Sequence, residues 1–432
     1  MAKPKNQDAI RILIMVEVKR RDTLPMENIA TELAKSAKYL VQLCGTADFV
    51  YAVLAFQPQV VIIGKPAYNM GDWLRCISGC TVVSLNPEQA GHDHKRVLSN
   101  FLDGLTSERG QAIELIDHHL IVDEQTKSFL VPHIDPTIMH VVGYPRLLRK
   151  TYARQATPVK DSMVIGVLCG EGAIDRQILH TTFENFQETG FEPYPSVDAL
   201  IANEVLEYLW INYIVSLLKK RYRVIVRYRS DKSSYLFEPC DVEFDGSDTL
   251  EYLFSEVDLV IAGTSGSAME AVLVGIPTII VVSLFRLGDG ATGAWTLPIP
   301  RIPWQPESLS ELLSMVDRRS RNDLDLVPDM RSYETVVQKA YFRGSEVNNS
   351  IERIAEVIRR CSPGIGAEVD LAKFRELLKP SLLQRILLFI ASNVSSSFAF
   401  RMAIIYMRVR RRLAPDGYLL HTVFVPKRRH VP

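Results

Sequence analysis

One stretch of the sequence has the residue order that a phosphate-binding turn requires. In SEVDLVIAGTSGSAMEAVLVGIPTIIV, residues 255–281, an apolar strand is expected to end at Gly263. The turn that follows consists of Thr264, Ser265, Gly266 and Ser267, and a helix is expected to begin directly after it. The first N–H groups of a helix have no intrahelical partners and carry partial positive charge, so they can hold phosphate oxygens. The turn is therefore a candidate site for a nucleotide phosphate.

A carboxylate lies close to this turn. Glu270 is three residues beyond Ser267, on the first turn of the expected helix. From there it can point into the same crevice and accept hydrogen bonds from ribose hydroxyls. The alternative is purely structural, because a Ser or Thr followed three residues later by Glu is also a common helix-capping box.

Two further carboxylates follow expected strands in the first part of the chain. Glu17 ends the run IRILIMVEV, and Glu88 comes shortly after TVVSL. In open α/β sheets, ligands bind outside the carboxyl ends of the strands. Either carboxylate could there deprotonate or orient an acceptor hydroxyl, so both are catalytic candidates. The alternatives are a salt bridge from Glu17 to Arg20 or Arg21, and a plain turn acid at Glu88.

Arginines occupy comparable positions. Arg146 follows a proline turn, and Arg227 ends the run YRVIVRY. A guanidinium can form two parallel hydrogen bonds to a phosphate, so both are candidate phosphate ligands. The alternatives are a structural turn around Arg146 and a solvated cation at Arg227.

The histidine-rich stretches do not have the spacing of a metal site. AGHDHK contains His92 and His94, and DHH contains Asp117, His118 and His119, but neither set has helical spacing or a convincing third ligand. We expect no bound metal. The sequence also lacks G-x-S-x-G, a P-loop and a G-x-G-x-x-G after the first strand, which argues against hydrolases, P-loop ATPases and Rossmann dehydrogenases.

Short apolar runs that alternate with helical stretches must position these residues. Strands are expected at residues 10–18, 60–64, 81–85, 118–122, 139–143, 163–170, 222–228, 257–263 and 277–283, and helices at 26–43 and 199–219. Apolar strands joined by helices indicate parallel sheets that are covered on both faces. The expected fold class is α/β, with two Rossmann-like doubly wound domains facing a cleft.

Changes in composition suggest the domain limits. The first domain is expected at residues 1–150 and a polar, basic linker at 151–162. The second domain is expected at 163–380, followed by a basic, apolar segment at 381–432.

The final segment carries nine Lys or Arg residues and one acid, Asp416. Such a segment either packs back on the first domain or binds an anionic membrane surface. The whole chain of 432 residues has 50 Lys plus Arg and 50 Asp plus Glu, so no global charge favours nucleic acid. Its N-terminal apolar run is too short for a signal peptide, and no run reaches the roughly 20 apolar residues of a membrane helix. We expect a cytoplasmic protein, either free or peripheral at the inner membrane face.

Four motifs resemble those of glycosyltransferase-B enzymes of the bacterial surface carbohydrate biosynthesis family, which has Kdo-transferase-like and polyol-phosphate-transferase-like relatives. The helix around Glu270, followed by Gly275 to Ile279, resembles the family's S-x-x-x-E-A helix and G-x-P-x-I strand. Residues 16–22 resemble P-x-E-x-x-x-R-E, residues 86–91 resemble D-E-E-G, and residues 142–146 resemble T-G-N-P-R. Tyr144 replaces the usual Asn, and residues 227–230 lack the histidine of the family's R-P-H-P-like turn.

The resemblance implies a glycosyltransferase that needs no cofactor beyond its nucleotide-sugar substrate. The first domain would hold a surface polysaccharide or a lipid-linked glycan acceptor, and the second would hold the donor. A CMP-sugar is the first expectation for the donor and a UDP-sugar the second. The alternatives are a sugar-nucleotide 2-epimerase, a polyol-phosphate transferase, or an inactive scaffold, which the absent histidine favours.

Overall fold

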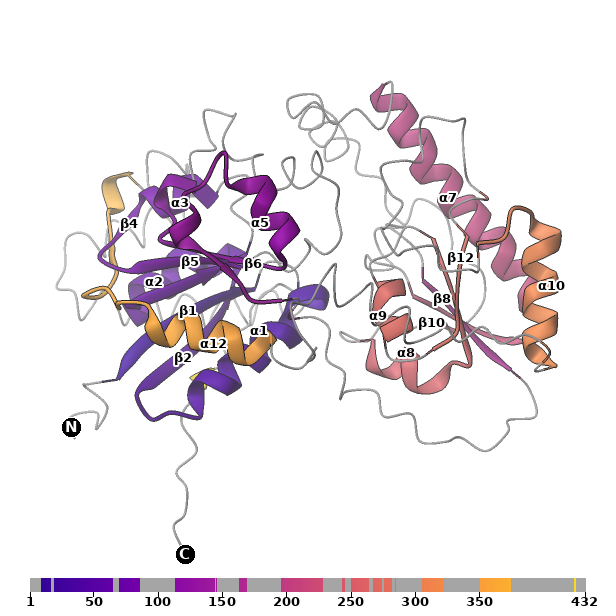
Figure 1. Ribbon diagram of the computed structural model, residues 1–432, viewed down its shortest axis with the longest axis horizontal. Coiled ribbons are helices and arrows are strands. Elements are labelled where there is room, and N and C mark those ends of the chain that lie inside the picture. The colour runs from indigo at the N-terminus through magenta and orange to yellow at the C-terminus, as the bar shows by residue number, and fades with distance from the viewer. Residues whose placement is uncertain are drawn as a thin grey trace, which may run out of the picture. The chain divides into compact units, whose positions relative to one another are not determined.

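The computed structural model describes residues 9–16, 19–64, 70–85, 113–143, 145, 163–168, 196–227, 243–244, 250–263, 267–273, 276–281, 284, 305–321, 323, 350–373 and 423–424. The chain divides into two compact units (Figure 1). Unit 1 comprises residues 1–90, 100–146 and 349–432, and unit 2 comprises residues 91–99 and 147–348.

Unit 1 is built around a seven-stranded sheet with the order β14-β2-β1-β3-β5-β6-β7 among the described residues. Its strands are β1 (Ile10–Val16), β2 (Tyr39–Gly45), β3 (Val60–Ile63), β5 (Thr81–Leu85), β6 (His118–Ile121), β7 (Met139–Val141) and β14 (Val423–Phe424). All pairs are parallel except β14 with β2. The described helical elements are α1 (Lys19–Ala34), η1 (Thr46–Asp48), α2 (Phe49–Phe56), α3 (Met70–Arg75), η2 (Ile113–Leu115), α5 (Glu124–Leu130), η3 (Pro136–Ile138) and α12 (Ser350–Arg360).

In unit 2, the described residues form a five-stranded parallel sheet with the order β10-β9-β8-β11-β12. Its strands are β8 (Val164–Leu168), β9 (Arg223–Arg227), β10 (Glu243–Phe244), β11 (Leu259–Ala262) and β12 (Thr278–Ile280). The described helices are α7 (Val197–Leu218), α8 (Glu251–Glu256), α9 (Ser267–Leu273) and α10 (Leu309–Ser320). In both units, the first strand along the chain is an interior strand of the sheet. The strands that follow extend the sheet first on one side of it and then on the other.

The central strands of both sheets consist of uninterrupted runs of buried, mostly apolar residues. Every residue of β3, β8 and β11 is buried, because a parallel sheet is covered on both faces and cannot alternate apolar with polar side chains. In unit 2, Ile165 and Val167 of β8 pack with Ile211 and Val215 of α7. The α/β architecture predicted from the sequence, with two parallel sheets, is confirmed.

One expected element is wrong. The apolar period over residues 26–43 predicted a single helix, but α1 ends at Ala34 and residues 39–45 form strand β2. This strand pairs with β1 along its whole length, from Ile10 with Tyr39 to Val16 with Gly45. Pairing with a central, buried strand outweighs the local helical pattern of YLVQLCG.

The end of the chain returns to unit 1. Helix α12 packs against α1 (Figure 1), and the Arg359 guanidinium donates to the Glu32 backbone oxygen and carboxylate, each at 3.2 Å. Farther along, Phe424 pairs with Val41 of β2. This division begins the returning segment at residue 349, whereas the sequence pattern had extended the second domain to residue 380. Among the described residues, no helix is long and apolar enough to cross a bilayer.

A strap at residues 361–370, the C-terminal strap, crosses the amino edge of the sheet in unit 1. The N–H groups of Gly364 and Gly366 donate to Gln59 O and Gly79 O, both at 3.0 Å. Strand β13 (Glu368–Val369) pairs antiparallel with β4 (Ile77–Ser78). The fit is tight, because a Cβ atom on Gly364 would lie 2.2 Å from Gly79 O.

Replacing Gly364 with alanine is therefore expected to destabilise unit 1. Overpacking of this kind typically costs about 1–3 kcal/mol, since backbone must move to relieve the contact. Urea unfolding of the variant measures the change. The matched control is Ile365→Ala, because Ile365 is 91% exposed and its truncation should change stability by no more than about 0.5 kcal/mol. Equal stabilities of the two variants would contradict the close contact.

Candidate functional site

The strand order of unit 2 reverses between β8 and β11. From β8 the chain proceeds to β9 and β10 on one side, and then to β11 and β12 on the other. This is the order in which doubly wound sheets bind ligands, in the crevice outside the carboxyl ends of the strands at the reversal point. The carboxyl edge of β8, β9 and β11 is therefore the candidate ligand-binding edge of this sheet.

Residues at this edge lie in one row across the sheet. Leu168 of β8 pairs with Arg227 of β9 on one side and with Ala262 of β11 on the other. Ala262 in turn pairs with Ile280 of β12. The Gly263 N–H donates to Leu168 O at 3.2 Å, which fixes the start of the turn after β11. Since neighbouring strands are about 4.8 Å apart, the Cα atoms of Arg227 and Ala262 are about 10 Å apart, with Leu168 between them.

Two charged side chains at this end of unit 2 are buried. Arg227 is 9% exposed and Glu270, in the first turn of α9, is 7% exposed. Helix α9 packs on β11 and β12, and its residues Ala268 and Ala271 are fully buried. Ser267, the first residue of the helix, is half-buried. Burying charge is costly unless polar groups surround it, so this end of the unit is a polar environment within an apolar fold.

The structure describes four of the residues that the sequence analysis proposed for this site. Arg227, Gly263, Ser267 and Glu270 all belong to elements that end or begin at the carboxyl edge of the sheet in unit 2. Thr264, Ser265 and Gly266 lie outside the described residues, as do Glu17, Glu88 and Arg146, and their roles stay predictions.

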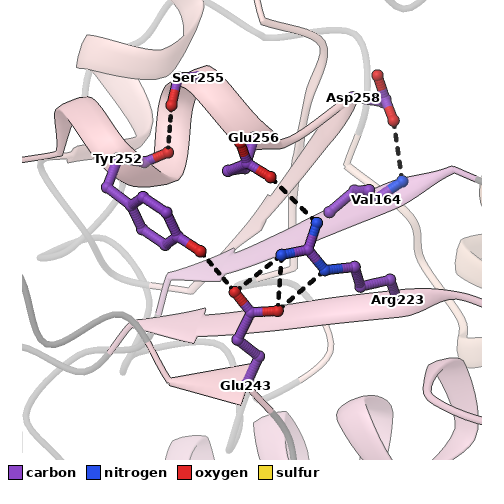
Figure 2. Close-up of polar contacts among 7 residues, drawn as sticks. All are labelled: Val164, Arg223, Glu243, Tyr252, Ser255, Glu256 and Asp258. Carbon is purple, nitrogen blue, oxygen red and sulfur yellow. Dashed lines mark hydrogen bonds and ion pairs between the residues drawn. The ribbon is translucent and has the colours of Figure 1, made fainter. Parts of the chain in front are cut away.

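The opposite, amino edge of the same sheet is closed by an ion cluster (Figure 2). The Arg223 guanidinium donates to both Glu243 carboxylate oxygens at 2.9 Å and to Glu256 at 3.0 Å. The Tyr252 hydroxyl donates to Glu243 at 2.7 Å, and Asp258 accepts from the Val164 N–H at 2.9 Å. These contacts tie together the starts of β8, β9 and β10 and the residue before β11. The two arginines of β9 therefore occupy opposite ends of the strand.

The carboxyl edge of unit 1 has buried acids that the sequence reasoning did not single out. The strand order there reverses between β1 and β3, and β1 ends at Val16, directly before Glu17. Asp22, in the first turn of α1, and Asp48, in the short helix after β2, are each 1% exposed. Asp22 is the last residue of the motif at residues 16–22, so this motif could have identified it as a candidate.

A histidine cluster occupies β6 and β7 of the same unit. The ring nitrogens His118 Nδ1 and His140 Nε2 are 3.1 Å apart, and His119 Nδ1 is 2.8 Å from the Ser84 hydroxyl on β5. Burial, followed by the charges of His118 and His140, lowers the pKa of His119 to about 4. Burial, followed by His118 and Lys127, also lowers the pKa of His140. Among the described residues, no three His, Cys, Asp or Glu side chains gather as metal ligands would.

Several solved structures are similar to this chain. A UDP-N-acetylglucosamine 2-epimerase is 12% identical, with 83% of this chain and 99% of that chain covered and a TM-score of 0.43. The wall teichoic acid polymerase TagF is 11% identical, with 82% and 90% covered and a TM-score of 0.48. The lipopolysaccharide outer core galactosyltransferase WaaB is 11% identical, with 81% and 99% covered and a TM-score of 0.36. No protein-family model and no curated protein sequence matches the chain. Because all of these TM-scores are below 0.5, a functional assignment has to rest on the chain's own residues.

Proposed function

We propose that this protein is a glycosyltransferase that binds a nucleotide sugar at the carboxyl edge of the sheet in unit 2. The observation that carries the proposal is the meeting of a strand-order reversal, a buried arginine and a buried carboxylate at one end of the unit. Arg227 ends β9, Gly263 follows β11, and Glu270 lies one turn into α9. The motif resemblance of residues 255–281 supports the same placement.

Each of these residues has a defined task in the proposal. The Arg227 guanidinium neutralises the nucleotide phosphate and stabilises the charge that builds up on it as the sugar leaves. Gly263, held by its bond to Leu168, lets the chain turn close to the phosphate, and Ser267 donates a hydroxyl hydrogen bond. Glu270 accepts from the ribose hydroxyls. Catalysis then consists mainly of positioning and charge stabilisation.

Unit 1 would hold the acceptor. Glu17 directly follows β1 at the reversal point of that sheet, and Glu88 follows β5 by three residues. One of them would take the proton from the acceptor hydroxyl. The proposed acceptor is a surface polysaccharide or lipid-linked glycan. The basic segment 381–432, of which residues 423 and 424 pair with β2, would bring the enzyme to the cytoplasmic face of an anionic membrane where such an acceptor is found.

Calorimetric and thermal-shift titrations with CMP, CDP, UDP and their sugars test the donor site. A ligand that binds only the folded state raises the free energy of unfolding by about 2.7 kcal/mol at a hundredfold excess over Kd. We expect one nucleotide series to bind more tightly than the others, with CMP first and UDP second. If none of these ligands binds, the proposed pyrimidine-nucleotide donor site is contradicted, and the inactive scaffold becomes the favoured alternative.

Incubation of the bound sugar nucleotide without an acceptor separates the remaining alternatives. A transferase leaves the sugar unchanged under these conditions, whereas a 2-epimerase inverts carbon 2 of the sugar without any acceptor. Preference for a polyol-phosphate nucleotide over any sugar nucleotide would instead identify a polyol-phosphate transferase.

A further inference from the structure

The histidine pair on β6 and β7 belongs to unit 1, whereas the proposed donor site belongs to unit 2. His118 begins β6, and His140 is the middle residue of β7, which is the last strand of the sheet among the described residues. The rings are tilted by 51° with centroids 5.2 Å apart, and their facing nitrogens are at hydrogen-bond distance, 3.1 Å. Both side chains are half-buried.

We infer that His118 and His140 form an acid-sensitive latch that holds the edge strand β7 on β6 and releases it when both rings are protonated. A hydrogen bond between two imidazole nitrogens needs one nitrogen that carries no proton. In the doubly protonated pair, both facing nitrogens carry protons and both rings carry a positive charge. The contact that joins the two strands at neutral pH then becomes repulsive.

The surrounding groups increase this repulsion. Lys127 on α5 donates to Met139 O of β7 at 3.1 Å, so a third cation is next to the pair. Burial lowers the pKa of His140 most, and the charges of His118 and of this lysine lower it further. On β6, His119 faces Ser84 of β5. The nearby carboxylates are engaged with backbone, since Asp117 accepts from the Val82 N–H and Asp123 from the Thr126 N–H.

The strand that the latch holds is short and leads out of unit 1. β7 has three residues, and its register on β6 pairs Leu120 with His140. Beyond β7, the N–H groups of Val142 and Gly143 donate to Ile121 O and Val122 O at 2.8 and 3.1 Å. The chain leaves unit 1 after residue 146. Release of β7 would therefore free the last strand that the structure describes before the chain passes into unit 2.

Hydrogen exchange of the full-length protein at about pH 7.5 and about pH 5.0 tests the latch, after correction for the intrinsic pH dependence of amide exchange. Uptake of one proton on opening changes the opening equilibrium by up to about tenfold per pH unit. We expect the protection of residues 139–143 to fall by about tenfold or more beyond any fall in β1 of the same unit, which reports the loss of stability of unit 1 as a whole. Equal protection of β7 at the two pH values, or equal loss in β1 and β7, would overturn the proposal.

Variants identify the groups responsible. His140→Gln and His118→Gln each leave a neutral hydrogen-bonding side chain and abolish the repulsion between two charged rings, so each should strongly reduce the excess pH dependence of β7 protection over that of β1. His133→Gln is the matched control, because His133 is an exposed histidine three residues beyond α5 and should leave the pH dependence unchanged. The latch is refuted if both test variants keep the pH dependence of the wild type. The wild-type comparison decides the matter by itself if a variant fails to fold.

Discussion

Replacing Arg227 with methionine is expected to weaken nucleotide binding by about ten- to a hundredfold. A hydrogen bond to a charged group contributes about 1.5–3 kcal/mol, and each 1.4 kcal/mol is a factor of about ten in affinity. Arg227 ends β9, in the row of residues that also contains Leu168 and Ala262, and it is 9% exposed. Methionine keeps most of the apolar volume of the side chain and removes the charge. Isothermal titration with the best-binding nucleotide of the thermal-shift series measures the loss.

The chain provides a matched control on the same strand. Arg223 is four residues earlier, at the amino edge, where it binds Glu243 and Glu256. Arg223→Met should leave the nucleotide Kd unchanged, because the amino edge of a parallel sheet is the wrong end for a ligand. Its expected cost is in stability, and a small one, since partly exposed ion pairs contribute about 0–1 kcal/mol.

The Arg227→Lys variant separates the contribution of the two parallel guanidinium hydrogen bonds from that of the positive charge. Lysine keeps the positive charge but cannot form the two parallel hydrogen bonds of a guanidinium. An intermediate affinity would indicate that Arg227 binds the phosphate with two bonds. If Arg227→Met and Arg223→Met bind the nucleotide equally well, Arg227 is a structural arginine and the donor site lies elsewhere.

Strands were predicted more accurately than helix boundaries, for a physical reason. Runs such as VVII of β3 and LVIA of β11 are apolar without interruption, which only a doubly covered strand requires. YLVQLCG of β2 is equally compatible with a helical period, and only its neighbour β1 decides the outcome. The sequence pattern gave packing back on the first domain as one alternative for residues 381–432, but it did not indicate that α12 contacts α1, because an amphipathic helix does not specify its packing partner.

Spacing in the sequence was sufficient to place the end of β11 and the start of α9, but not to predict contacts that depend on strand register. Gly263 and Glu270 are seven residues apart, so a strand–turn–helix pattern places them without further information. His118 and His140 are 22 residues apart and meet only because β6 pairs Leu120 with His140. The Arg223–Glu243 pair depends in the same way on β9 and β10 lying side by side. Such contacts require the strand order, which local patterns do not contain.

Lowering the pH from about 7 to about 4 is expected to destabilise unit 1 by about 3 kcal/mol through His119 alone. Burial, together with the charges of His118 and His140, lowers the pKa of this ring to about 4 in the folded protein, whereas the unfolded value is about 6.5. At pH values between about 4 and 6.5 the unfolded chain binds up to one more proton than the folded chain, so the free energy of unfolding decreases as the pH is lowered. Each pKa unit corresponds to about 1.4 kcal/mol, and the contribution is fully present above about pH 6.5.

Urea unfolding of the wild type and of His119→Gln at several pH values between about 4 and 7 measures this contribution, with hydrogen exchange in β5 and β6 reporting on unit 1. Glutamine can keep a hydrogen bond to Ser84 but does not titrate. The variant should therefore be less stable than the wild type at neutral pH, if it differs at all, and should lose stability more slowly as the pH falls. His133→Gln, at an exposed site, should follow the wild-type curve. Parallel curves for the wild type and His119→Gln would show that acid acts on other groups, because the buried imidazole would then gain its proton at the same pH in the folded and unfolded chains.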